Sequence, residues 1–178
     1  MAENSGPQWV ARFPGDNSLS GLAEPFRDKA TRFVKAMRDA GMTVTISTVF
    51  RPTERAYLMH WAWQIARKHH PLTGIPPQPG VNINWNWSGG KTAAEQMVEG
   101  YGIVFEPAFP THHSSRLAID MDISWTGQPT IVKADGTHDT IATAPKNGAQ
   151  NAELWKVGAG YGVIKLVVDH PHWSADGH

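Results

Sequence analysis

Four potential metal ligands lie close together in one segment of the chain. The stretch THHSSRLAIDMDI, residues 111–123, places His112 and His113 shortly before Asp120 and Asp122. The chain contains no cysteine, so any metal ion must be bound by histidine, aspartate or glutamate side chains. We expect a metal centre to which this segment contributes only part of the ligand set.

A second group of such side chains occurs near the end of the sequence. The stretch DHPHW contains Asp169, His170 and His172. A catalytic zinc ion takes three protein ligands and keeps a fourth position open. His113 in a loop and Asp120 on a strand could supply two of them, and His170 and His172 are the candidates for the third. Asp169 would accept a proton from the attacking water and deliver it to a leaving amine.

Strands must bring these side chains together. In RLAIDMDIS, residues 116–124, the alternation is typical of a strand with an apolar back and a front that carries Asp120 and Asp122. The β-branched stretch TVTISTVF, residues 43–50, predicts another strand, and Arg51 stands at its end. We therefore expect a site that is built over the ends of strands in one sheet.

The remaining elements predict a fold of the α+β class, with helices packed on a mostly antiparallel sheet. Asp135-Gly136 predicts a hairpin, and VIKLVVD predicts a last strand over 163–169. The length suits a single catalytic domain over 1–178, whose metal-site core spans about 43–173. Four helices are predicted, at residues 22–40, 53–68, 92–99 and 151–157, and the first shows apolar residues at three- and four-residue steps.

Composition excludes several classes of partner. The 16 basic and 16 acidic residues balance, with 9 histidines uncounted, and such a surface argues against general nucleic-acid binding. No apolar stretch has the length of a membrane-spanning helix, so we expect no stable membrane insertion. The N-terminal stretch lacks the basic and apolar regions of a signal peptide. We expect a monomer that is synthesised in the cytoplasm.

Three motifs in a fixed order resemble one family of enzymes. His113, Ala118 and Asp120 form the pattern H-x-x-x-x-A-x-D, and D-x-x-H-W follows at residues 169–173. Upstream, FRPTERAYLMH over residues 50–60 places an arginine after an aromatic residue. Together these motifs resemble the M15 zinc peptidases, which include D-Ala-D-Ala carboxypeptidases, dipeptidases and phage endolysins. The resemblance covers most of the chain and implies the Hedgehog/DD-peptidase fold.

The resemblance implies a role for each matched residue. His113, Asp120 and His172 would be the ligands of one zinc ion. Asp169 would be the catalytic base and acid. Arg51 would polarise the scissile carbonyl or bind a carboxylate of the substrate.

Two departures from the family pattern bear on the substrate. Many members have glycine where this chain has Arg116, and many have glutamate where it has Asp169. Aspartate at this position resembles the L-alanyl-D-glutamate endopeptidases of phage endolysins. His112 and His170 are out of register with the family pattern and rank behind His113 and His172 as ligands.

Other side chains have two possible roles each. Asp122 shares a strand face with Asp120 and either faces the substrate or is an ordinary solvated residue. Trp85 and Trp87, in the Pro- and Gly-rich loop over 71–90, either fill the core or form a wall for the substrate. Trp173 is expected to pack beside the metal site.

The sequence therefore predicts a zinc-dependent peptidoglycan peptidase that cuts a stem peptide, most readily at the L-Ala-D-Glu bond. Such a cell-wall hydrolase would reach its substrate through a holin-like route or after lysis. A D,D-carboxypeptidase or D-Ala-D-Ala dipeptidase is the alternative among enzymes. A non-catalytic, zinc-stabilised binding module is the alternative outside them.

Overall fold

Apolar side chains assemble two separate cores in the computed structural model, which describes all 178 residues. One compact unit comprises Met1–Gly15 and Arg51–Ser114, and the other comprises Asp16–Phe50 and Ser115–His178. The α+β class is confirmed, with mostly antiparallel strands. The interpretation of residues 1–178 as a single catalytic domain stays a prediction.

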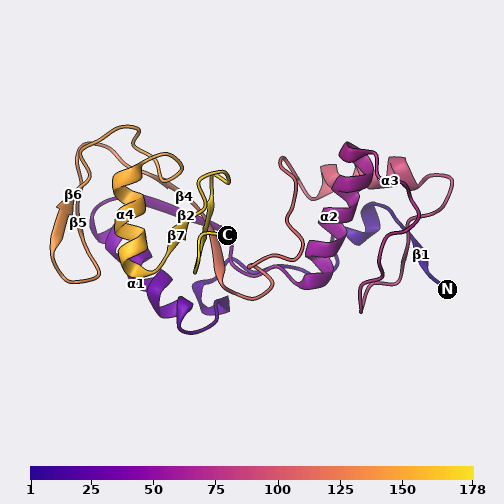
Figure 1. Cartoon of the computed structure of the whole chain (residues 1–178), viewed down its shortest axis with the longest axis horizontal. Helices are drawn as coiled ribbons and strands as arrows, with labels where there is room; N and C mark the ends of the chain where they lie inside the picture. The colour runs from indigo at the N-terminus through magenta and orange to yellow at the C-terminus, as the bar shows by residue number, and fades with distance from the viewer. The chain divides into compact units, whose positions relative to one another are not determined.

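A four-stranded antiparallel sheet forms the framework of the second unit (Figure 1). The central pair of strands aligns Asp120 with His172, and the neighbouring strand aligns Thr45 with Asp122. The strands follow the order β2 (Thr43–Thr48), β4 (Ala118–Ser124), β8 (His172–Ser174) and β7 (Ile164–Lys165).

Alternation along β4 divides its side chains between the core and the opposite face, as predicted. Ile119, Met121 and Ile123 are buried in the core, where two helices, α1 (Phe26–Asp39) and α4 (Ala152–Tyr161), also bury side chains. Because successive strand residues point to opposite faces, the aspartates of β4 lie on the face away from these helices. The core of this unit thus fixes which face carries the carboxylates.

A small hairpin completes the second unit. The strands β5 (Thr130–Val132) and β6 (His138–Thr140) pair antiparallel around the predicted Asp135-Gly136 turn. Gly136 has a φ of 83°, which is a conformation that favours glycine. The hairpin prediction is confirmed.

The first unit is built on two helices, α2 (Thr53–Lys68) and α3 (Gly90–Gly100). Leu58 and Ile65 of α2 are buried with Met97 of α3. A short 3-10 helix (Pro7–Trp9) and the parallel pair β1 (Glu3–Asn4) and β3 (Ile83–Asn84) complete this unit. No helix in the structure combines the length and the apolar character needed to cross a membrane.

Predicted boundaries differ from the structure by a few residues in most elements, and three of these differences have a visible cause: a proline, a register shift and a turn. The helix predicted over 22–40 begins only at Phe26, after Pro25 and a 3-10 turn at Leu19–Gly21. The strand predicted over 43–50 ends at Thr48, where the pairing register shifts.

The third difference affects the site directly, because the strand predicted over 163–169 ends at Lys165. The chain then turns and returns as β8, and Val167 and Val168 at this turn are exposed. The β-branched sequence favours a strand, but hydrogen bonds within the turn override that local preference. Asp169 therefore lies in a turn rather than at the end of a strand.

Two glycines of α4 test the packing against the sheet. A Cβ atom on Gly158 would lie 2.7 Å from the Trp173 ring and 2.8 Å from the Val163 carbonyl oxygen, whereas one on Gly160 would meet nothing. We expect Gly158→Ala to lower the free energy of unfolding by about 1–3 kcal/mol through overpacking. Gly160→Ala should raise it by up to about 1 kcal/mol, because alanine favours a helix. Urea unfolding of both variants measures the difference, and equal effects would contradict this packing.

Candidate metal centre

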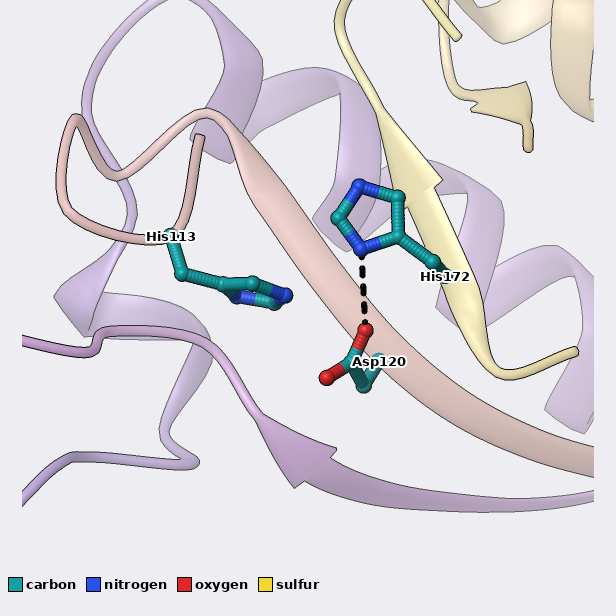
Figure 2. A group of neighbouring side chains, drawn as sticks. All are labelled: His113, Asp120 and His172. Carbon is teal, nitrogen blue, oxygen red and sulfur yellow. Dashed lines mark hydrogen bonds and ion pairs between the residues drawn. The ribbon is translucent and has the colours of Figure 1, made fainter. Parts of the chain in front are cut away.

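Three buried side chains meet in front of β4. His113, Asp120 and His172 each direct one potential ligand atom to a common point, and these atoms all lie within 4.8 Å of one another (Figure 2). Their exposed fractions are 2%, 8% and 6%. Buried carboxylate and imidazole groups in such proximity could hold a metal ion. Neither His112 nor His170 belongs to the group.

Strand pairing brings the second and third members together. Asp120 lies within β4, and His172 is its direct cross-strand neighbour at the start of β8. The first member, His113, lies in a turn that precedes β4. In that turn the His113 carbonyl accepts a hydrogen bond from the Arg51 backbone amide at 3.3 Å. The Ser114 hydroxyl donates to the Arg51 carbonyl at 2.9 Å.

The ring of His172 is oriented by a backbone carbonyl. Its Nε2 atom lies 3.1 Å from the main-chain oxygen of His178, the last residue, and its Nδ1 atom lies 3.1 Å from Oδ1 of Asp120. A carbonyl oxygen only accepts, so Nε2 must donate, and Nδ1 of the neutral ring then carries a lone pair. A lone pair that faces a carboxylate oxygen requires a positive charge between them, either a second ring proton or a metal ion.

The third ligand distinguishes these two possibilities. A proton shared by Asp120 and His172 would need no further partner, whereas His113 brings another potential ligand atom to the same point. Two imidazoles and one carboxylate match the three-ligand set of catalytic zinc, which leaves one position for water or substrate. The same set also accommodates other divalent ions, so the residues fit a metal but do not specify which one.

The residues after β8 hold the carbonyl that orients His172. The buried Ser174 hydroxyl oxygen accepts hydrogen bonds from the backbone amides of Gly177 at 2.8 Å and His178 at 3.0 Å. Gly177 has a φ of 85°, in the region that favours glycine. Partners of this kind fix the ring orientation and tautomer of a ligating histidine. The turn 174–178 thus supports the third ligand.

Lys165 is a buried ammonium group behind the turn that carries Asp169. Its Nζ donates to the carbonyl oxygens of Leu166 and Asp169, and to that of His172 at 3.1 Å. Lys165 is only 6% exposed. Burial lowers the pKa of Lys165 to about 8, while the carboxylates of Asp169 and Asp120 oppose this shift. The group therefore stays largely cationic at neutral pH and binds the turn together.

Asp169 lies in this turn, half-buried and three residues before His172. Its backbone amide donates to Leu166 and its carbonyl accepts from the His172 amide, both at 3.2 Å. These hydrogen bonds fix the position of Asp169 relative to His172, the two ends of the D-x-x-H motif. Asp169 is not part of the ligand group itself. Its catalytic role, like that of Arg51, stays a prediction.

The other predicted site residues differ in how far they are buried. Trp173 is fully buried on the core side of β8, with its ring centroid 5.4 Å from that of Phe33, and Trp85 is buried in the other core. Neither indole offers a surface to a substrate. Trp87 is half-buried and donates to the Ser5 hydroxyl at 2.9 Å. Asp122 is exposed and lines a cavity.

Three supporting residues were missed in the sequence. Lys165 had one available signal, because a lysine within the apolar run VIKLVV is a candidate for a buried amine. Ser174 and His178 had none, because their hydrogen bonds depend on the path of the chain after β8.

Comparisons with known protein families and with characterised proteins find no match to this chain.

We expect the protein to bind one divalent metal ion per chain, and zinc serves as the test ion. His172→Ala and Asp120→Ala should each lower the zinc affinity by more than about 100-fold, because they remove a ligand rather than a supporting group. The exposed His138 of β6 provides a control, and His138→Ala should bind zinc like the wild type. Competition titration with a chromophoric chelator measures the affinities. Equal affinity of His172→Ala and the wild type would exclude this ligand set.

Lys165→Met should weaken both the turn and the metal site. It removes the ammonium donor from three carbonyl oxygens, each of which keeps one backbone amide donor, so we expect a loss of about 1–3 kcal/mol in the free energy of unfolding. Zinc affinity should fall by about 10-fold, because His172 loses its support. Urea unfolding and zinc titration test both effects. The exposed Lys156 of α4 gives the matched control, Lys156→Met, which should change neither quantity.

Proposed function

We propose that the protein is a zinc-dependent peptidoglycan peptidase that hydrolyses a stem-peptide bond, with L-Ala-D-Glu as the preferred bond. The observation that carries the proposal is the buried group of His113, Asp120 and His172. These residues follow the order and spacing in which M15 peptidases supply their zinc ligands. Chain topology adds support, because adjacent antiparallel strands align Asp120 with His172. We propose the Hedgehog/DD-peptidase fold on the same grounds.

The position of Arg116 adds an independent argument. Its φ is 62°, in the left-handed region where glycine is favoured. Many M15 members have glycine at this position. Glycine adopts this backbone conformation without strain, so the conformation of Arg116 is one that the family's residue would favour. In this chain the guanidinium lies 3.7 Å from the centroid of the Phe50 ring and donates to the Gly21 carbonyl at 2.7 Å. These contacts compensate for the strained conformation.

In the proposed mechanism, His113, Asp120 and His172 hold the zinc ion. When bound, zinc supplies Lewis acidity, which polarises a carbonyl and lowers the pKa of water towards about 7. Asp169 accepts a proton from the attacking water and later donates it to the amine that leaves. Lys165 anchors the turn that carries this carboxylate. Arg51 polarises the scissile carbonyl or binds a substrate carboxylate.

The proposed substrate lies outside the cell membrane. A protein synthesised in the cytoplasm would reach it through a holin-like route or after lysis. The partner is then the peptidoglycan stem peptide, and the protein acts as a monomer.

Digestion of purified sacculi tests this proposal. Zinc-loaded protein should release fragments with new D-Glu amino termini, detected by mass spectrometry. Free D-Ala instead would indicate a D,D-carboxypeptidase or dipeptidase, and no product at all would favour a binding module.

The role of Asp169 has its own test. Asp169→Asn should reduce the hydrolysis rate by at least about 100-fold, because general acid–base catalysis contributes that much. It should bind zinc like the wild type, because Asp169 is not a ligand. Full activity of a zinc-loaded Asp169→Asn protein would contradict the mechanism. The exposed Asp139 supplies the control substitution, Asp139→Asn.

A further inference from the structure

A cavity of about 290 Å³ opens on the face of the sheet that carries the aspartates of β4. Thr43 and Thr45 of β2 line one side, and Asp122 of β4 lies beside them. Asn147 and His170 contribute from two separate loops. The cavity therefore combines residues from four places in the sequence, all within the second unit.

Strand geometry relates this cavity to the metal ligands. Asp120 and Asp122 are two residues apart on one face of β4, and His170 and His172 are two residues apart after β7. A strand rises by about 3.3–3.4 Å per residue, so the two aspartates are separated by about 7 Å along β4. An extended peptide has a similar rise. A substrate group held at Asp122 would then lie about two residues from a bond placed over the metal ligands.

The charge of the side chains that line the cavity favours a cation as its ligand. Asp122 is the only carboxylate among the lining side chains, and no lysine or arginine lines the cavity. The Asp122 carboxylate has no hydrogen-bond or ion-pair partner within the chain and is exposed to solvent. Hydroxyl oxygens of Thr43 and Thr45 and the His170 ring are further acceptors. Such a set suits a primary ammonium group, which has three donors and no acceptor.

A second metal ion fits these residues less well. Asp122 and His170 are not members of a group of three or more metal-competent side chains, and the chain contains only one such group. Threonine hydroxyls and a single carboxylate leave too few anionic donors for a divalent cation. An organic cation fits this lining better.

We propose that this cavity binds the side-chain amino group of the diamino acid that follows D-Glu in a stem peptide. The proposal rests on the peptidase function and names the substrate feature that the same site recognises. In L-Ala-D-Glu cleavage this amino group belongs to the second residue after the scissile bond, and its flexible side chain can reach Asp122, about 7 Å along β4 from Asp120. Asp122 accepts from the ammonium group, and Thr45, its cross-strand neighbour, supplies a second acceptor. A neutral side chain at this substrate position leaves the carboxylate without its partner.

Two synthetic peptides and one isosteric variant test the inference. One peptide is L-Ala-γ-D-Glu-L-Lys-D-Ala, and the other carries 6-hydroxynorleucine, which is uncharged, in place of lysine. Wild-type protein should cleave the lysine peptide with a kcat/KM about 10-fold higher, as expected for a hydrogen-bonded charge. Asp122→Asn should lose this preference by slowing only the lysine peptide. Asp139→Asn, on the separate β5–β6 hairpin, should keep it. An unchanged preference in Asp122→Asn, or an equal loss for both peptides, would overturn the proposal.

A binding measurement separates failure of this inference from failure of the peptidase function. If zinc-loaded wild type cleaves neither peptide, the proposed function is wrong, and titration of ¹⁵N-labelled protein decides the inference by itself. The lysine peptide should shift the amide resonances of Thr45 and Asp122, and the hydroxynorleucine peptide should shift them much less. Equal or absent shifts with both peptides would overturn the proposed recognition of the amine.

Discussion

The facing pair of His172 Nδ1 and Asp120 Oδ1, 3.1 Å apart, is the constraint around which the site is organised. The other ring nitrogen donates to the carbonyl of His178, so the pair brings two acceptors together. Buried acceptors in this arrangement are costly unless a cation lies between them. The presence of His113 at the same point makes a metal ion the natural cation. Strand pairing, the turn 174–178 and Lys165 all maintain this pair.

Support for the site comes mainly from backbone groups. Lys165 donates to carbonyl oxygens on both sides of the turn between β7 and β8. The Ser174 hydroxyl accepts hydrogen bonds from the backbone amides of Gly177 and His178. On the other face of β8, Trp173 packs against Phe33, and Gly158 allows α4 to approach closely. One short strand thus joins the hydrophobic core to the metal ligands. Substitutions on its core side should therefore affect the ligands through β8.

The proposed peptidase assigns different tasks to the two faces of one sheet. The face toward α1 and α4 provides stability, and the opposite face carries the ligands and the cavity beside Asp122. A peptide that lay along β4 would contact the metal ligands and this cavity in succession. Recognition of the substrate and hydrolysis would then use side chains two residues apart on the same strand.

Local sequence determined much of this protein. The break at Arg51-Pro52 and the apolar content after it predicted α2, and alternation predicted the two faces of β4, because successive strand residues point to opposite sides. The three ligands were also predicted, since their spacing resembles a known family and few residue types bind metals without cysteine. Tertiary structure decided the rest. The end of β7, the turn that carries Asp169 and the orientation of the His172 ring depend on Lys165, Ser174 and His178. Hydrogen bonds of this kind depend on the folded path of the chain, which a local sequence pattern does not predict.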